Sequence, residues 1–133
     1  MAQKDDGRQY DLTGIAEFAF GDTATTVAAD ALELPEGATV VGGYVIVDVA
    51  SDAATSDNLD VGDAADPNRY SATPIDLKTL GATALSVTGF ETSQPTMVQV
   101  TRTETGVPTA GAFRLILKYV KRDRSNENQG DVT

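Results

Sequence analysis

Apolar and polar residues alternate along much of this chain with the period of two that is typical of half-buried β-strands. Segment 97–103, MVQVTRT, places Val98 and Val100 on one face and Met97, Gln99, Thr101 and Thr103 on the other. Segment 113–120 shows the same alternation: Phe113, Leu115, Leu117 and Tyr119 on one face, Arg114, Ile116, Lys118 and Val120 on the other. We therefore predict two amphipathic strands near the C-terminal end.

A longer apolar segment, 34–50, has the sequence LPEGATVVGGYVIVDVA. Pro35 and Gly37 predict a turn, because proline presets φ and glycine tolerates positive φ. The β-branched and aromatic residues that follow favour a strand. Apolar residues occupy both odd- and even-numbered positions of this segment, which point to opposite faces of a strand. We therefore expect an element packed on both faces or bent between two sheets, with Gly42 and Gly43 as the bend or bulge.

Shorter patterns predict the remaining elements. Segments 14–21, 58–62, 69–72 and 82–87 are predicted strands; 23–32 is a predicted strand for which a short helix stays open; 73–81 resembles one or two helical turns. About eight short strands with frequent turn signals predict an all-β fold, an antiparallel β-sandwich or closed barrel, with a jelly roll favoured. An immunoglobulin-like sandwich is the alternative, although the chain lacks that fold's Cys, Trp, Cys pattern.

The 133 residues suit one domain. We place the jelly-roll domain at 14–120. Residues 1–13 form an extended N-terminal arm, and residues 121–133 form a polar C-terminal tail or arm. The chain has no apolar run of transmembrane length and no signal-peptide pattern at its start, so we expect no membrane contact and synthesis in a cytoplasm.

Composition narrows the chemistry. The chain has no Cys, no His and no Trp, which removes the usual nucleophile–base pairs, the usual zinc ligands and the best sugar-stacking ring. We predict no enzyme and no cofactor. The formal net charge is −10, and residues 1–70 hold fourteen Asp or Glu against three Lys or Arg. Such an acidic chain repels phosphate, so we expect no nucleic-acid partner.

One acidic series merits attention as a candidate calcium site: Asp48, Asp52, Asp57, Asp60, Asp63 and Asp66. Its spacing departs from the EF-hand pattern, because Leu59 and Val61 stand where ligands are needed. We therefore expect solvated loop carboxylates rather than a metal site. Within the series, Asp66 and Arg69 are expected to form an ion pair.

The order of several motifs resembles a known family. The quoted features are LPEGATVVGGYVIVDVA, a V-G-D segment followed by P-x-R-Y in NLDVGDAADPNRY, and the closing strand in MVQVTRTETGVPTAGAFRLILKYV. Together, over about residues 14–120, the chain resembles the small jelly-roll cement or decoration proteins of tailed bacteriophage capsids. These motifs consist of turns and strand patterns and carry no catalytic residue.

The resemblance implies a structural virion protein on the outer surface of an assembled capsid, where it stabilises the shell by bridging major capsid protein subunits. It also implies a homo-oligomer, with a dimer favoured over a trimer. The irregular, charged ends of the chain supply our candidate capsid contacts: Lys4, Arg8, Tyr10, Lys121, Arg122 and Arg124. The alternative function is a carbohydrate- or receptor-binding β-sandwich, with or without calcium.

Overall fold

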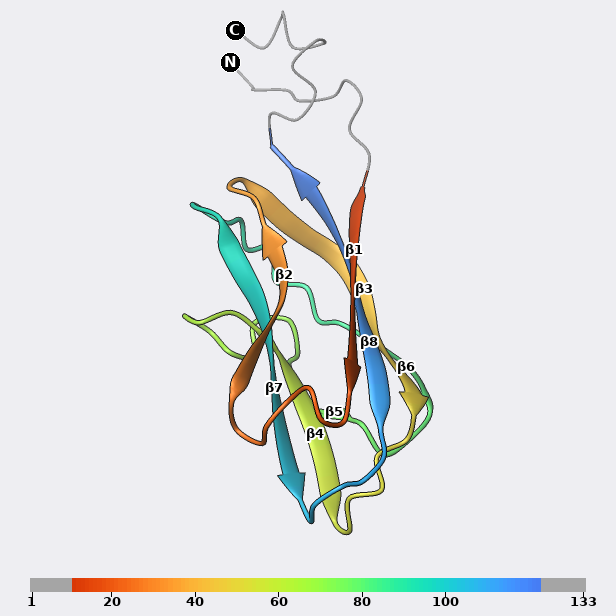
Figure 1. The fold of residues 1–133 in the computed structure, drawn as a ribbon. Helices are drawn as coiled ribbons and strands as arrows, with labels where there is room; N and C mark the ends of the chain where they lie inside the picture. Colours follow the sequence, from red (N-terminus) through yellow and green to blue (C-terminus); the bar gives the residue numbers. More distant parts are fainter. Residues whose placement is uncertain (1–10, 123–133) are drawn as a thin grey trace, which may run out of the picture.

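Eight β-strands make up the regular structure of the computed structural model, which describes residues 11–122. They are β1 (Leu12–Ala19), β2 (Ala28–Leu34), β3 (Ala38–Val49), β4 (Ser56–Gly62), β5 (Ile75–Asp76), β6 (Gly81–Ala84), β7 (Thr96–Thr105) and β8 (Ala112–Lys121). Two antiparallel four-stranded sheets, β1-β8-β3-β6 and β2-β7-β4-β5, face each other (Figure 1). Every connection except β4 to β5 crosses between the sheets, as in a jelly roll. The predicted all-β jelly-roll sandwich is confirmed.

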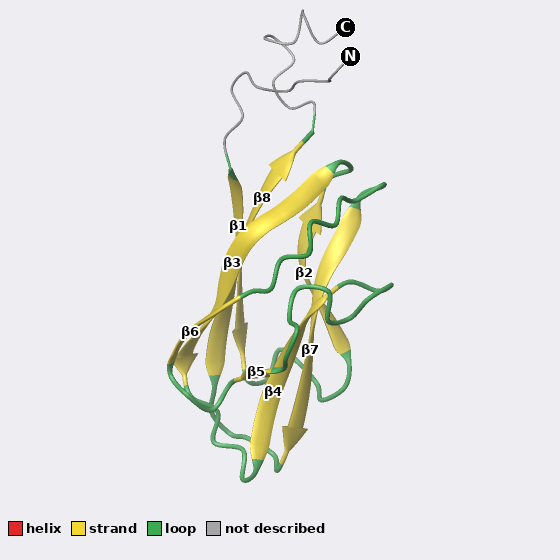
Figure 2. Cartoon of the chain, turned by 180° about the vertical axis from the view of Figure 1, so that it is seen from behind, coloured by secondary structure: helices red, strands yellow, loops and turns green. Residues whose placement is uncertain are grey.

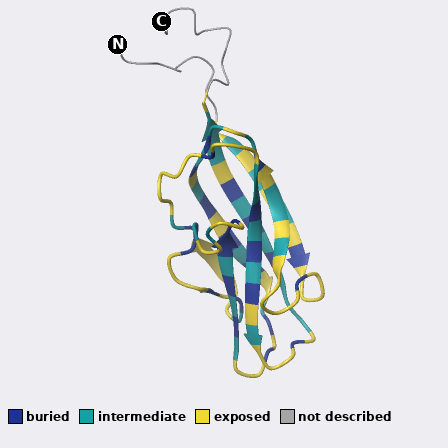
Figure 3. Ribbon diagram, turned by 90° about the vertical axis from the view of Figure 1, so that its left-hand side faces the viewer, coloured by how far each residue is buried: buried dark blue, intermediate teal, exposed yellow. Residues whose placement is uncertain are grey.

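The core lies between the sheets, where the inward side chains of both meet. Val98 and Val100 of β7 and Leu115 of β8 are fully buried, as the alternation predicts. Phe18 of β1 stacks on Phe113 of β8 with ring centroids 5.1 Å apart. Buried and exposed residues alternate along the strands in Figure 3. Each fully buried Val or Leu contributes about 1.5–3 kcal/mol of transfer free energy, so this layer is the main stabilising term.

The long strand β3 contains a bulge that explains its apolar residues on both parities. Its pairing with β8 shifts register between Val40 and Gly42. The inward positions are Ala38 and Val40 before the shift and Gly43, Val45 and Val47 after it. The prediction of a strand packed on both faces is therefore wrong, because the outer face of β3 remains open. The predicted irregularity at the glycine pair is confirmed.

Two predicted elements of the middle segment are absent from the described chain. Segment 69–72 is not a strand: the Tyr70 N–H donates to the Val61 carbonyl at 2.8 Å, within a turn. Segment 73–81 is not helical and instead contains the two-residue strand β5. Ile75 and Leu77 are both buried with Asp76 exposed between them, a period of two that an extended chain satisfies and a helix does not. Figure 2 shows these residues as loop around a short strand.

Other boundaries differ from the prediction by a few residues. The second strand is shifted from 23–32 to Ala28–Leu34, after a turn in which Thr26 has φ 62°. The strand predicted at 82–87 is Gly81–Ala84. β1 begins at Leu12, inside the range 1–13 that is predicted as an arm. Of the other residues of the predicted arm and tail, only Asp11, Lys121 and Arg122 are described, apart from Thr13 in β1. Within those residues, no helix has the length and apolar character that crossing a membrane requires.

The bulge generates a prediction about two neighbouring glycines. A Cβ on Gly43 would lie 2.3 Å from the Ile116 carbonyl oxygen, at a φ of 153°, whereas a Cβ on Gly42 meets nothing within 4 Å. We expect Gly43→Ala to lower the free energy of unfolding by about 2–5 kcal/mol through overpacking and backbone strain. Gly42→Ala should change it little. Urea unfolding of both variants tests this, and equal losses would contradict the bulge geometry.

Candidate functional site

The described ends of the chain lie at the same end of the sandwich, because β1 and β8 are antiparallel and Leu12 pairs with Tyr119 (Figure 1). Lys121 and Arg122 lie here beside a groove of about 570 Å³, also lined by Glu36, Gly37, Glu91, Thr92 and Ser93. We call this region the terminal pole. Of the six candidate capsid contacts, the structure thus places Lys121 and Arg122, which are neighbours in the sequence, at this pole. Lys4, Arg8, Tyr10 and Arg124 fall outside the described residues.

Arg122 is anchored at the terminal pole by contacts with two loops. Its guanidinium pairs with Glu91 at 2.6 Å, and its backbone N–H donates to the Gly37 carbonyl at 2.9 Å. The hydrogen bond from Arg122 holds the pKa of Glu91 below its usual value. The loops after β2 and before β7 are therefore tied to the point where β8 ends.

The acidic series is dispersed rather than gathered into a site. Four of its members accept hydrogen bonds from different partners: Asp48 from Arg114, Asp52 from Thr109 and Ala110, Asp57 from Arg102, and Asp63 from Arg69. Within residues 11–122, no three Asp or Glu side chains gather in a way that would hold a metal ion. The expectation of solvated loop carboxylates is wrong for Asp57 and Asp63, which are buried parts of the fold.

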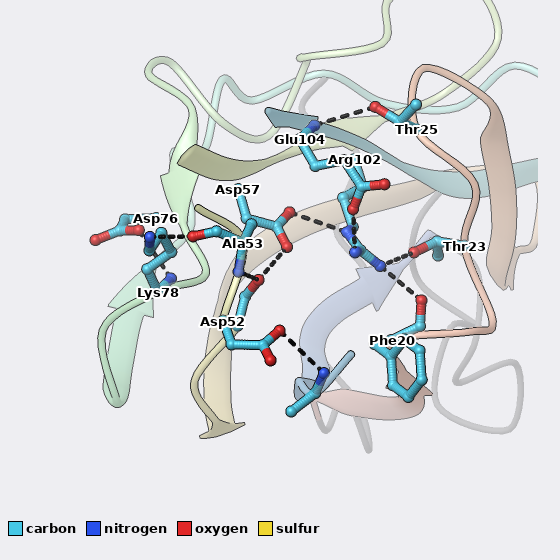
Figure 4. Close-up of polar contacts among 12 residues, drawn as sticks. Phe20, Thr23, Thr25, Asp52, Ala53, Asp57, Asp76, Lys78, Arg102 and Glu104 are labelled. Atoms are coloured by element: carbon cyan, nitrogen blue, oxygen red, sulfur yellow. Dashed lines mark hydrogen bonds and ion pairs between the residues drawn. The ribbon is translucent and has the colours of Figure 1, made fainter. Parts of the chain in front are cut away.

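Asp57 belongs to a polar network inside the sandwich, centred on Arg102 (Figure 4). The Arg102 side chain is 3% exposed and donates to Asp57 at 2.9 Å. Its other nitrogens donate to the Phe20 carbonyl at 2.8 Å, to the Thr23 hydroxyl at 3.1 Å and to the Glu104 carboxylate. The network therefore joins β4 and β7 of one sheet to the loop that follows β1 of the other.

The sequence analysis did not identify this network, although the alternation of inward and outward residues along β4 and β7 indicates it. Arg102 has the same parity as Val98 and Val100, so period two places it inward on β7. Asp57 shares the parity of Leu59 on β4, and both are buried. Opposite charges on inward positions of paired strands indicate a buried ion pair.

The network is suited to structural support rather than to chemistry. Both Asp57 oxygens are engaged, one by Arg102 and one by the Ser51 hydroxyl at 2.5 Å. The adjoining cavity has a volume of about 10 Å³, room for at most about one water molecule. A substrate therefore has no access to these groups in this arrangement.

The V-G-D and P-x-R-Y motifs fold on each other at the end of β4. Gly62 packs so closely on this loop that a Cβ would lie 2.2 Å from the Asp66 carbonyl oxygen. Asp63 accepts from the backbone N–H groups of Ala65 and Asp66 and pairs with Arg69 at 2.7 Å. The predicted Asp66–Arg69 pair is therefore wrong, since Asp63 is the partner. The Arg69 guanidinium also lies 3.6 Å from the Phe90 ring centroid.

The outer face of the β1-β8-β3-β6 sheet carries an apolar row. The strand registers place Ile15, Ile116, Tyr44 and Ala84 side by side across all four strands. Ile15 is 57% and Tyr44 46% exposed. The outer face of the other sheet differs, since the charged residues on its outward strand positions are all carboxylates: Asp30, Glu33, Asp60 and Asp76. The sandwich therefore has two chemically distinct faces.

The buried pair generates a prediction with a matched control on the surface. Arg102→Met should lower the free energy of unfolding by about 3–5 kcal/mol, because it leaves the Asp57 carboxylate buried without its counter-charge. Arg114→Met removes a similar strand-to-strand pair, Arg114–Asp48, whose side chains are 35% and 40% exposed. That change should cost at most about 1 kcal/mol. Urea unfolding measures both, and comparable losses would show that burial does not separate the two pairs.

A pH dependence follows from Asp63. Burial raises the pKa of this carboxyl, but hydrogen bonds from Arg69 and from backbone N–H groups, with the Arg69 charge, bring it below the ordinary value. A lowered folded-state pKa stabilises the fold above the unfolded pKa of about 3.9, and the stabilisation is lost as pH falls below it. Asp63→Asn should cost about 1–3 kcal/mol at neutral pH. Urea unfolding should show the difference from wild type shrinking below about pH 4; a constant difference would contradict this assignment.

Comparisons with known proteins give structural matches only. No family model and no curated protein sequence matches the chain. Among solved structures, a chain of the "Cyanophage Pam1 capsid asymmetric unit" is similar with a TM-score of 0.69 and 25% identity, over 91% of this chain and 92% of that one.

Two further solved structures share the fold. A chain in the acid-stable capsid structure of Helicobacter pylori bacteriophage KHP30 has a TM-score of 0.63 and 16% identity, over 84% of this chain and 92% of that one. A chain in the capsid of Ralstonia phage GP4 has a TM-score of 0.64 and 19% identity, over 91% and 90%. Over nearly its whole length, this chain is therefore similar in fold to chains of phage capsids.

Proposed function

We propose that this chain is a capsid cement protein, a structural virion protein that binds the outer surface of an assembled phage capsid and bridges major capsid protein subunits. The observation that carries the proposal is the match along almost the entire length of both chains to the Pam1 capsid chain. The motifs that resemble cement proteins in the sequence support it independently. The protein acts without catalysis, as a homo-oligomer with a dimer favoured.

The described interior is consistent with a role that needs shape rather than chemistry. The polar groups of the Arg102 network are engaged with one another, and the acidic series is divided among separate partners. A cement protein needs only a rigid body and surfaces that recognise neighbouring subunits. Because it binds the assembled shell and not separate subunits, it stabilises the shell by mass action.

The terminal pole supplies the proposed capsid contacts. Lys121 and Arg122 lie where the described chain ends, and β1 begins at the same end. The described residues that adjoin segments 1–10 and 123–133 therefore lie at one end of the sandwich. We propose that these segments, with Lys4, Arg8, Tyr10 and Arg124, contact the capsid together with Lys121 and Arg122.

Co-sedimentation with empty capsids that lack the protein tests this function. We expect saturable binding at a fixed ratio to the major capsid protein, no binding to unassembled subunits, and a higher capsid melting temperature. Neutralising the pole and arms (Lys4, Arg8, Lys121, Arg122 and Arg124 to Gln) should weaken binding by about tenfold or more. Lys78→Gln, a control whose ammonium bonds the Ala53 carbonyl away from the pole, should leave capsid binding unchanged.

Three outcomes would contradict the proposal. Assembly of the purified chain into shells by itself would make it a shell-forming subunit instead. Absence of capsid binding would remove the cement role. Calcium-dependent binding to glycans without capsid binding would favour the carbohydrate- or receptor-binding alternative.

A further inference from the structure

The connection between β6 and β7 is held to three other parts of the sandwich by three successive side chains. Phe90 stacks with Arg69, whose Cζ lies 3.6 Å from the ring centroid. Glu91 pairs with Arg122 at 2.6 Å. Thr92 is 2% exposed, and its hydroxyl bonds the turn between β2 and β3. This part of the connection is therefore fixed from three directions.

Thr92 fixes the backbone that carries the Glu91 carboxylate. Its hydroxyl donates to the Pro35 carbonyl at 2.7 Å and accepts from the Ala38 N–H at 2.9 Å. Its own N–H donates to the Ala38 carbonyl at 2.9 Å, and its carbonyl accepts from the Gly37 N–H at 2.9 Å. Because a buried residue makes these bonds, the backbone at Glu91 has a defined position relative to the turn between β2 and β3.

The Glu91 carboxylate holds the Arg122 guanidinium with both of its oxygens. Arg122 Nε donates to Oε2 at 3.1 Å, and Nη2 donates to Oε1 at 2.6 Å. The Arg122 backbone N–H donates to the Gly37 carbonyl at 2.9 Å, in the same turn that Thr92 bonds. A bidentate pair fixes the orientation of an arginine as well as its position. Arg122 is thus held by side chain and backbone directly after β8 and directly before segment 123–133.

This ion pair has little value as a source of stability. The side chains of Arg122 and Glu91 are 54% and 38% exposed, and pairs with such exposure contribute little to the free energy of unfolding. The pair acts instead on conformational freedom, because a long arginine side chain that is already ordered loses less entropy when a partner binds. Preorganisation of this kind raises affinity without adding a contact.

We propose that Glu91 is a positioning residue for capsid binding: it holds Arg122, the residue before segment 123–133, in the orientation that an acidic surface of the capsid recognises. The partner surface is acidic because the proposed contacts other than Tyr10 are lysines and arginines. The inference rests on the proposed cement function and deepens it, by naming the charge of the partner surface and a residue that acts on it through another. Glu91 carries the same charge as such a surface, so its direct effect on binding is repulsive. Its indirect effect, through Arg122, is the larger one.

Two carboxylates of the same groove separate positioning from simple charge. Glu91→Gln removes a negative charge together with the Arg122 pair, whereas Glu36→Gln removes a negative charge and leaves that pair in place. Co-sedimentation of the full chain with capsids that lack it should show about two- to fivefold weaker binding for Glu91→Gln. Glu36→Gln should bind about twofold more tightly than wild type, because it removes repulsion from an acidic partner.

An Arg122→Gln background shows whether Glu91 acts through Arg122. The pair is already absent in that background, so adding Glu91→Gln should cause no further weakening. Glu91→Gln by itself should unfold at nearly the wild-type urea concentration, because the pair is exposed. Its weaker capsid binding then cannot be attributed to loss of the fold.

Hydrogen exchange of the Arg122 backbone N–H tests the positioning itself, in the protein without capsids. This N–H bonds the Gly37 carbonyl, and the Glu91 pair holds the same residue. Glu91→Gln should speed its exchange by about threefold or more, because the end of β8 then opens more often. Exchange at Leu115, in the middle of β8, should stay the same.

Several results would overturn the inference. Tighter binding by Glu91→Gln, or equal effects of Glu91→Gln and Glu36→Gln, would show that the two carboxylates act by charge alone. Equal weakening by Glu91→Gln with and without Arg122, or unchanged exchange at Arg122, would show that Glu91 does not act through that residue. A Glu36→Gln variant that binds no more tightly than wild type would contradict the acidic partner surface.

The proposed function can fail separately from this inference. A wild type that does not bind capsids would contradict the cement function, on which the role of Glu91 rests. The exchange measurement needs no capsid and still decides whether Glu91 holds Arg122. Capsid binding by the wild type that Glu91→Gln leaves intact would contradict the positioning role and leave the cement function standing.

Discussion

The ion pair between Arg102 and Asp57 is the interaction on which the rest of the sandwich depends. Hydrophobic burial drives the two sheets together without fixing their relative position, because apolar contacts are not directional. The Arg102 guanidinium adds direction: it joins β7 to β4 and also bonds the Phe20 carbonyl and the Thr23 hydroxyl in the loop after β1. An unpaired charge in that position costs several kcal/mol, so alternative packings of the sheets are disfavoured.

The glycine bulge in β3 has a comparable effect on the surface. By changing the inward parity between Val40 and Gly43, it lets both halves of a long strand contribute to one core. It also sets Tyr44 on the outer face, level with Ile116 and Ile15. The same irregularity thus helps to complete the core and to form the apolar row.

The charges of the molecule are divided by location in a way that fits a protein that works through its surfaces. Buried carboxylates such as Asp57 and Asp63 hold loops and strands in place, whereas the carboxylates outward on the β2-β7-β4-β5 sheet face solvent. Cations occur at the terminal pole and beside the apolar row. The two outer sheet faces and the terminal pole, where Lys121 and Arg122 lie beside Glu36 and Glu91, therefore differ in the chemistry that they present to a neighbouring subunit.

The sequence by itself determined the fold class, most strands and the inward residues of β7 and β8, because period two depends only on neighbouring residues. It also indicated the irregularity at Gly42 and Gly43. Tertiary structure decided the rest: Ile75 and Leu77 are extended because both must reach the core, and Arg69 pairs with Asp63 because the loop closes on Gly62. The Arg102 network and the apolar row likewise depend on pairing between strands far apart in the chain. Such pairing follows from register and sheet order, which local patterns do not specify.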